Sequence, residues 1–155
     1  MNNDVMFSSK TDEWSTPQDL FDKLNDEFHF TLDVCANKSN HKCDLYYDRE
    51  QDGLKMPWSG YVVWCNPPYG KEIGKWVKAA YHEHIAHGTT IVMLLPARTD
   101  TRWFHHYVLG QAAIRFLQGR LKFGDSKNSA PFPSMLAVYN DKSYSDSLNL
   151  LNRNE

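Results

Sequence analysis

The segment YVVWCNPPYG at residues 61–70 decides the fold, because it joins an apolar run directly to a rigid loop. Its first five residues are apolar or aromatic, which is typical of a short strand in a sheet that is covered on both faces. Pro67 and Pro68 end that strand, since each proline fixes its φ angle at about −65° and has no N–H to offer a neighbouring strand. The segment therefore predicts a parallel sheet with a loop at the carboxyl end of one strand.

Apolar strand patterns and amphipathic helix patterns alternate on both sides of this segment. Further strands are expected at residues 30–34, 45–47, 90–95, 113–117 and 134–139. Helices are expected at residues 17–28, 73–87 and 100–109. Thr16 should cap the first helix, and Pro17 should occupy its first turn. The alternation predicts a three-layer α/β fold with a mostly parallel sheet and an antiparallel C-terminal strand.

The length of 155 residues suits one domain. We expect this domain at residues 11–140, between a flexible leader at residues 1–10 and a polar tail at residues 141–155, with no separate target-recognition domain. No apolar run approaches the roughly 18 residues of a membrane span. Three cysteines without a signal peptide favour a reducing compartment, so the protein is expected in the cytoplasm.

Charge is distributed unevenly, although the net charge is only −2. Residues 1–60 hold 12 acidic and 6 basic side chains, a net charge of −6. Residues 98–127 hold 6 basic and 2 acidic side chains, a net charge of +4. The asymmetry is consistent with one face for a polyanion, although charge placement of this kind also arises by chance.

The loop after the quoted strand combines hydrogen-bond acceptors with an aromatic ring. Asn66 offers a side-chain carbonyl, Pro67 offers a backbone carbonyl, and neither proline has an N–H. An exocyclic base amine fits such a loop: two acceptors for its hydrogens would favour a pyramidal nitrogen whose lone pair points at an electrophile. Tyr69 would stack on the base after the base is flipped out of the duplex. The expected catalytic residues are Asn66, Pro67, Pro68 and Tyr69, and positioning would supply most of the rate.

These four residues resemble motif IV of the amino-methyltransferases, [DNS]-P-P-[YFW]. The sequence around them resembles the phage-type DNA N-6-adenine-methyltransferases (the phage Dam family) in WSTPQDLFDKL, FTLDVCAN, DGLKMPW, VVWCNPPYG, LLPARTDTRWF, RFLQGRLKF and APFPS. The resemblance implies a Rossmann-like fold that binds S-adenosyl-L-methionine and methylates the N6 amine of adenine in double-stranded DNA. It also implies a phage or prophage origin and a link to restriction-modification.

The resemblance further implies which residues bind the cofactor. Asp33 would lie near the methionine amino group, and Asp52 would accept from the adenine amine of the cofactor. Glu50 or Asp48 would accept from the ribose hydroxyls. The full set of expected cofactor-binding residues is Trp14, Thr16, Pro17, Asp33, Cys35, Ala36, Glu50, Asp52 and Asn66. The sequence departs from the family pattern in two respects: Ala36-Asn37-Lys38 replaces the usual glycine-rich turn, and only 19 positions separate Asp33 from Asp52, too few for a full helix–strand–helix–strand passage.

Basic side chains near the predicted strand ends are candidates for phosphate contacts. The expected DNA-binding residues are Lys71, Arg98, Arg102, Arg120, Lys122 and Ser134, with Lys75 as a further candidate. Each cation can equally be a solvated surface charge. Sequence preference would come from loops such as residues 119–133. The oligomeric state stays open between a monomer and a homodimer.

Two other interpretations of the NPPY loop stay open. One is a methyltransferase that acts on glutamine side chains of proteins, because such enzymes also use an NPPY motif. The other is a non-catalytic nucleic-acid-binding module of the same fold, which the altered turn at residues 36–38 favours and the intact NPPYG disfavours. No metal site is expected, since neither of two clusters has a ligand spacing typical of zinc. These clusters are His82, Glu83, His84 and His87, and Cys35, His41, Cys43 and Cys65.

Overall fold

One five-stranded sheet forms the centre of the computed structural model, which describes residues 14–124 and 128–140. The strands lie in the order β1 (Leu32–Asp33), β2 (Val62–Cys65), β3 (Thr90–Pro96), β5 (Ser134–Tyr139) and β4 (Ala113–Phe116). Strands β1, β2 and β3 are parallel, whereas β5 is antiparallel to both β3 and β4. The predicted antiparallel C-terminal strand is therefore confirmed. The expected leader and tail lie outside the described residues.

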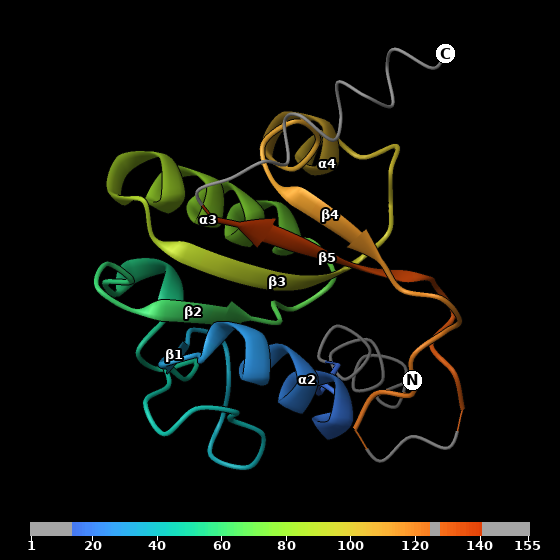
Figure 1. Ribbon diagram of the computed structural model, residues 1–155, viewed down its shortest axis with the longest axis horizontal. Coiled ribbons are helices and arrows are strands. Elements are labelled where there is room, and N and C mark those ends of the chain that lie inside the picture. The colour runs from blue at the N-terminus through green and yellow to red at the C-terminus, as the bar shows by residue number, and fades with distance from the viewer. Residues whose placement is uncertain (1–13, 125–127, 141–155) are drawn as a thin grey trace, which may run out of the picture.

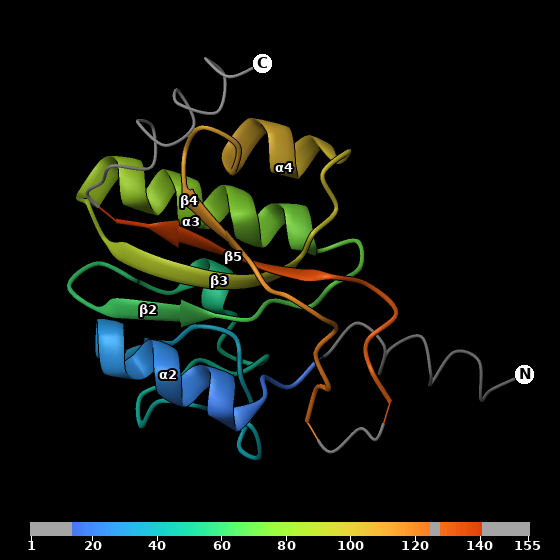
Figure 2. The ribbon, with the colours of Figure 1, turned by 45° about the vertical axis from the view of Figure 1, so that its right-hand side comes forward.

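Helices cover both faces of the sheet, which confirms the three predicted layers (Figures 1 and 2). Helix α2 (Gln18–Phe28) lies on one side, and α3 (Ile73–His87) and α4 (Arg102–Tyr107) lie on the other. A short 3₁₀ helix, η1 (Gly53–Lys55), packs near α3. Helix α3 has the bounds that the sequence predicts, because its apolar stripe ends where Gly88 adopts the left-handed conformation that terminates helices.

Four local predictions are wrong. The strand expected at residues 30–34 is shorter and spans only Leu32–Asp33. Helix α4 is shorter than residues 100–109, because the Thr101 side chain caps its first turn by accepting the Phe104 N–H. Residues 45–47 form only an isolated bridge to β1, since β1 is two residues long and offers no longer ladder. Thr16 does not cap α2: Pro17 occupies the N-cap, and none of the described side chains makes a cap hydrogen bond there.

Buried aromatic rings fix α2 to the sheet. Trp64 of β2 packs edge-on against Phe21 at 5.5 Å between ring centroids and lies 5.4 Å from Phe30. Rings of this size dominate core energetics, and truncating one costs about 3–5 kcal/mol. This packing sets the position of the chain that enters α2, which later contributes to the functional site.

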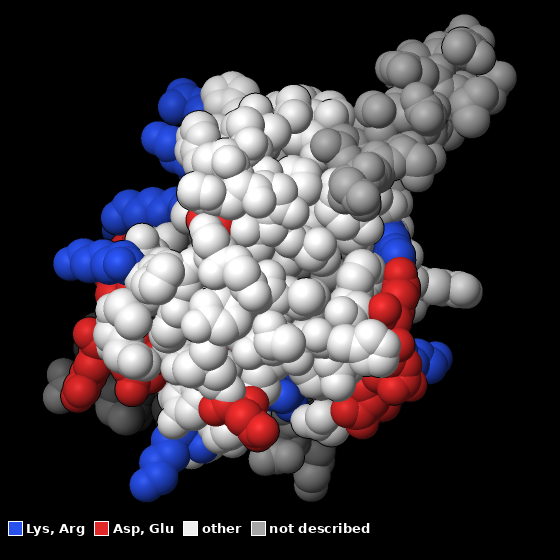
Figure 3. Space-filling model, turned by 60° about the vertical axis from the view of Figure 1, so that its left-hand side comes forward, with Lys and Arg blue, Asp and Glu red and all other residues white. Residues whose placement is uncertain are grey.

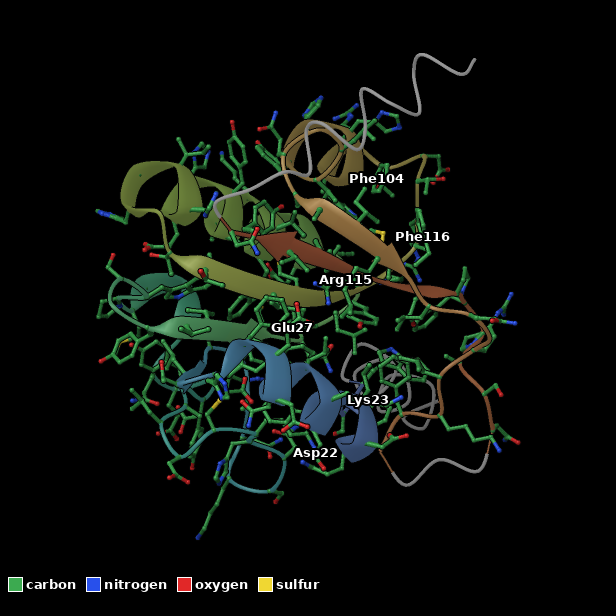
Figure 4. The ribbon with its side chains drawn as sticks, in the orientation of Figure 1. Asp22, Lys23, Glu27, Phe104, Arg115 and Phe116 are labelled. Carbon is green, nitrogen blue, oxygen red and sulfur yellow. The ribbon has the colours of Figure 1, made fainter. Side chains whose placement is uncertain are left out.

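An ion pair connects α2 to the far edge of the sheet. The Arg115 guanidinium in β4 donates to both carboxylate oxygens of Glu27 at 2.8 and 2.7 Å, and it lies 5.4 Å from the Phe28 ring (Figure 4). The pair holds the pKa of Glu27 below its ordinary value, chiefly through the hydrogen bond. Arg115 belongs to the basic stretch at residues 98–127 in the sequence, but in the structure its charge is paired with Glu27 of α2.

Figure 3 shows the side of the molecule where β2 and β3 begin. Acidic and basic side chains both lie around the rim of this face, on either flank, and its centre is largely uncharged. This face therefore offers a polyanion no continuous basic surface. Among the described residues, no helix is long and apolar enough to cross a membrane.

Predicted site residues lie at the opposite end of the sheet, where the parallel strands β1, β2 and β3 end. Asp33 ends β1, Asn66 follows β2, and Pro96 ends β3. Ser134 begins β5 and pairs with Pro96, because β5 runs against its neighbours. Ligands in open α/β sheets bind beyond the carboxyl ends of parallel strands. The topology thus brings residues from four distant parts of the sequence to one edge.

Candidate active site

A cavity of about 710 Å³ opens at the carboxyl ends of β1 and β2. Its size is typical of sites for small molecules and cofactors. Two of the expected cofactor-binding residues, Pro17 and Glu50, lie outside the lining in the described part of the chain, whereas Asp48, the alternative to Glu50, belongs to it. The other expected residues all line the cavity: Trp14, Thr16, Asp33, Cys35, Ala36, Asp52 and Asn66.

Asn66 has one end of its amide engaged and the other end free. Its Nδ2 donates to the backbone carbonyl of Trp14 and, at 3.0 Å, to Oγ1 of Thr16. Its Oδ1 is buried and has no hydrogen-bond partner among the described residues. A buried acceptor without a donor costs about 1–3 kcal/mol, so this oxygen is poised for a ligand that brings an N–H.

Tyr69, at the other end of the same loop, is fully engaged. Its hydroxyl donates to the Leu94 carbonyl at 2.8 Å, and only 2% of the residue is exposed. Phe132 and Phe123 lie against its ring at 5.5 and 6.2 Å between centroids. Burial raises the pKa of Tyr69 well above its ordinary value, so the phenol stays protonated. The ring that was predicted to stack on a base is therefore buried, in contact with Phe123 and Phe132.

Asp33 places a buried carboxyl group at the floor of the cavity. Its two oxygens accept backbone N–H groups of Cys35 at 3.3 Å and Lys42 at 3.0 Å. Burial nevertheless raises its pKa to about 6, because desolvation outweighs these two hydrogen bonds. A cationic group beside Asp33 would offset this desolvation, so the carboxyl group is suited to bind an amine.

In the loop after β1, hydrogen bonds of asparagine side chains form a tight turn where the family pattern has a glycine-rich one. The Asn37 side chain accepts the N–H groups of Ser39 and Asn40 at 2.8 and 2.9 Å, and the Asn40 side chain accepts the Asn37 N–H at 2.7 Å. These bonds fold residues 37–40 into a tight turn, as asparagine side chains commonly do. The turn brings Lys42 back to Asp33, so that the loop closes around the carboxylate.

A second tight turn forms the opposite wall. Asp52 has a φ angle of 58°, an uncommon value for a residue other than glycine, and its side chain accepts the Leu54 N–H at 3.1 Å. The next residue, Gly53, must be glycine, because a Cβ there would lie 2.0 Å from the Val34 carbonyl oxygen. The Gly53 backbone therefore packs closely against Val34, which directly follows the strand that carries Asp33.

The further DNA-binding candidate Lys75 lines the cavity and pairs with Glu72 at 3.0 Å, whereas the other expected DNA-binding residues lie apart from the lining. Lys71, Arg98, Arg102, Arg120 and Lys122 are exposed. Arg98 lies 5.7 Å above the Phe132 ring, next to the covered Tyr69. Ser134 is buried, and its hydroxyl has no hydrogen-bond partner among the described residues. Asn66 and Ser134 thus each keep a buried side-chain oxygen without a hydrogen-bond partner in the described structure.

No group of three metal-binding side chains gathers in residues 14–124 and 128–140. His84, which the sequence places in a histidine cluster, instead lies with its Nδ1 2.8 Å from the Thr89 carbonyl oxygen. Glu83 of the same cluster accepts from the hydroxyls of Ser59 and Thr89. These residues join the end of α3 to neighbouring loops.

Comparison with known proteins accounts for this arrangement. The DNA N-6-adenine-methyltransferase (Dam) family matches residues 5–155. The chain belongs to this family. It is 31% identical over 142 residues to the DNA N-6-adenine-methyltransferase of Haemophilus phage HP1, which covers 86% of this chain and 82% of the phage protein. It is 35% identical over 112 residues to the enzyme of the same description from Escherichia phage T1, covering 71% of this chain and 46% of that protein.

Family membership decides between the three interpretations of the NPPY loop. The predicted activity, methylation of the N6 amine of adenine in DNA, is confirmed, and an enzyme of this kind requires a methyl donor.

Several cavity residues were absent from the sequence-based site, including Asn40, Lys42, Gly53, Glu72 and Trp76. Only the Asp-Gly pair at residues 52 and 53, a common turn signal, could have pointed to one of them.

Proposed function

We propose that the cavity binds S-adenosyl-L-methionine and that the loop at residues 66–69 presents the N6 amine of a flipped adenine to it. The observation that carries this proposal is the buried, unpartnered Oδ1 of Asn66. Native structures rarely leave such an acceptor unsatisfied without a functional reason. An exocyclic amine supplies the N–H that this oxygen lacks, and adenine is the base on which the family acts.

The donor set of the cavity fits the proposed cofactor. S-adenosyl-L-methionine, when bound, supplies an electrophilic methyl group on a positively charged sulfur. Asp33 would accept from the methionine amino group, Asp52 from the adenine amine and Asp48 from the ribose hydroxyls. Trp14, Thr16, Cys35 and Ala36 would complete the walls.

Asn66 and Pro67 would prepare the amine for attack. The Asn66 Oδ1 and the Pro67 carbonyl would accept the two amine hydrogens, which favours a pyramidal nitrogen with an available lone pair. Asp33, Asp48 and Asp52 would hold the cofactor so that it can supply its methyl group to this lone pair, and the nitrogen would then release one N–H proton to water. Pro68 keeps the loop rigid, so positioning supplies most of the acceleration.

Tyr69 would stack on the flipped base once Phe123 and Phe132 move away from its ring. Ser134 would then offer its buried hydroxyl to the base. Lys71, Arg98, Arg102, Arg120 and Lys122, all exposed, would contact phosphates. Sequence preference would come from the segment at residues 119–133, which carries both covering rings.

A transfer assay tests the proposal. The full chain is incubated with methyl-labelled S-adenosyl-L-methionine and unmethylated duplex DNA, and the DNA is then digested to nucleosides. Label in N6-methyldeoxyadenosine is the expected result. Label in another nucleoside, or in the protein alone, would contradict the proposed target. Equilibrium binding of the unlabelled cofactor, measured in parallel, reports on the cavity independently of transfer.

A further inference from the structure

The hydroxyl of Thr16 has a partner that its sequence context does not predict. A threonine before a proline and an amphipathic stripe is expected to cap the helix, yet α2 begins without a side-chain cap in the described residues. Thr16 is only 5% exposed, and its Oγ1 instead accepts from Nδ2 of Asn66 at 3.0 Å. The two residues lie 50 positions apart in the sequence, so only the fold brings them together.

This contact fixes the orientation of the Asn66 amide. An asparagine amide has two N–H donors and one carbonyl oxygen, and the two ends have nearly the same shape. Both Nδ2 donors of Asn66 are engaged, one by Thr16 Oγ1 and the other by the Trp14 carbonyl. Rotation of the amide by 180° would break both bonds and set Oδ1 against the Trp14 carbonyl oxygen. The two bonds together therefore keep Oδ1 available as an acceptor.

Packing supports both acceptors of the Asn66 amide. The Trp14 ring has edge contacts with Phe123 and Phe132, each at 5.3 Å between centroids. Thr16 is buried directly before α2, whose packing against Trp64 fixes its position. Of the two acceptors, the Thr16 hydroxyl is the one that a substitution can remove, because the Trp14 acceptor belongs to the backbone.

We propose that Thr16 is a positioning residue for methyl transfer, which holds the Asn66 amide so that Oδ1 receives an N–H of the target amine. This inference rests on the proposed function of Asn66. It differs from the role that the family resemblance implies, in which Thr16 binds the cofactor. The Thr16 hydroxyl proton stays available to a ligand in the cavity, so the two roles are separated by experiment rather than by geometry.

The test compares Thr16→Val, which keeps the shape and removes the acceptor, with Thr16→Ser, which keeps the acceptor. At saturating cofactor and DNA, Thr16→Val should lower kcat about 10- to 100-fold, because a misplaced reacting group costs rate even when binding persists. Cofactor Kd should stay within about threefold, and Thr16→Ser should restore kcat to within about threefold of the wild type. A normal kcat with a raised cofactor Kd in Thr16→Val would overturn the proposal.

A matched control removes a buried threonine hydroxyl elsewhere. Thr89 is buried at the amino end of β3 and donates to Glu83, far from the cavity lining. Thr89→Val should therefore leave kcat unchanged even if it lowers the melting temperature. An equal loss of kcat in both valine variants would assign the Thr16 effect to general destabilisation and overturn the proposal.

Hydrogen exchange gives a readout that does not depend on activity. The side-chain amide signal of Asn66, assigned by its disappearance in Asn66→Ala, should be protected in the wild type and in Thr16→Ser. Faster exchange is expected in Thr16→Val, and unchanged protection would overturn the proposal. If Thr16→Val does not fold, Thr16→Ser is compared with the wild type instead. This variant keeps the hydroxyl, so loss of both the amide protection and kcat in it would contradict positioning by that group.

The outcomes also separate this inference from the proposed function. An active Asn66→Ala variant would remove the proposed role of Asn66 and the inference with it. An inactive Asn66→Ala variant together with a fully active Thr16→Val variant would remove only the inference.

Discussion

The two sides of the loop at residues 66–69 differ in how ready they are for a ligand. On the cofactor side, a cavity of about 710 Å³ is already formed, and Asp33 and Asp52 are held in it by backbone hydrogen bonds. On the base side, Tyr69 is covered by Phe123 and Phe132, and the Asn66 Oδ1 is buried without a partner in the described structure. In the proposed function, the cofactor side is therefore preformed, and the base side would have to rearrange to admit a base.

This difference indicates which step of the reaction each side of the loop affects. A preformed cavity binds a small ligand without ordering costs, because its walls keep their positions. A covered base site binds only after its cover moves, so the apparent affinity for the base is reduced by the population of the uncovered state. We therefore expect substitutions on the cofactor side to act on cofactor affinity, and those on the base side to act on DNA affinity or on transfer.

The largest effect is expected at Asn66, where the two sides meet. Asn66→Ala removes the acceptor for the target amine and should lower kcat about 10³-fold, similar to the loss of one oriented hydrogen-bonding group in other active sites. Cofactor Kd, measured by calorimetry, should change little, because the preformed cavity keeps its other walls. Transfer at a near-normal rate would contradict the mechanism.

Gly53 tests whether the cofactor side is as rigid as its geometry indicates. A Cβ at this position would lie 2.0 Å from the Val34 carbonyl oxygen, which belongs to the backbone and cannot turn away. Gly53→Ala should destabilise the fold by about 1–3 kcal/mol and weaken cofactor binding about 10- to 100-fold. Gly74→Ala in α3 is the matched control: its Cβ meets only ordinary contacts at 3.8 Å, and alanine favours a helix, so it should neither destabilise the fold nor weaken cofactor binding. Equal effects in the two variants would show that the cofactor side adapts.

Asp33 gives the cofactor side a dependence on pH. Burial raises its pKa to about 6, so the carboxyl group is neutral below this pH and a carboxylate above it. Affinity for a cofactor with a cationic amine should rise about tenfold per pH unit as the pH approaches 6 and then level off. Asp33→Asn should bind weakly at every pH between 5 and 8, roughly the range in which a carboxyl group of this kind changes charge. A wild-type affinity that is flat across this range would contradict the assignment.

The stability of the free protein should follow the opposite trend. The folded state favours the neutral Asp33, because the charged form is desolvated. This contribution is fully present below the ordinary pKa of 3.8 and is lost as the pH rises through about 6. Urea unfolding of the wild type and of Asp33→Asn at several pH values isolates the contribution.

The smallest effect is expected on the base side. Phe132→Leu keeps an apolar side chain but weakens the edge contacts with Tyr69 and Trp14, each worth about 0.5–1.5 kcal/mol. Easier uncovering of Tyr69 should lower KM for DNA about 2- to 10-fold, with cofactor Kd unchanged. If KM for DNA rises instead, Phe132 holds the flipped base rather than covering its site, and the contrast between the two sides becomes smaller.

The order and type of the main elements could be predicted from local patterns. The apolar runs before Asn66 and in β3 predict buried strands, and the helical stripe of α3 predicts a helix whose bounds agree with the structure. Residues 45–47 and α4 were predicted too long, because a short apolar run does not reveal how much partner strand or helix is available. Local propensity sets the type of an element, whereas its neighbours set its length.

The site could be predicted only in part. Asn66, Asp33 and Asp52 follow strands or occupy turns, so their positions at the sheet edge follow from the alternation of elements. Lys42 and Asn40 reach the cavity through a turn of asparagine hydrogen bonds that no residue pattern announces. The sequence left Glu50 and Asp48 as alternatives for the ribose, and of these only Asp48, whose side chain accepts the Gln51 N–H, belongs to the lining.

The sequence alone determined the chemistry of the loop. Two prolines without N–H groups, an asparagine and a tyrosine at residues 66–69 make a rigid, acceptor-rich surface whatever surrounds them, and they indicate an amine as the target. Only the tertiary structure decided which of these groups is ready. Burial of Tyr69 under Phe123 and Phe132, and the partner that Thr16 offers to Asn66 across 50 residues, arise from long-range packing that no local pattern encodes.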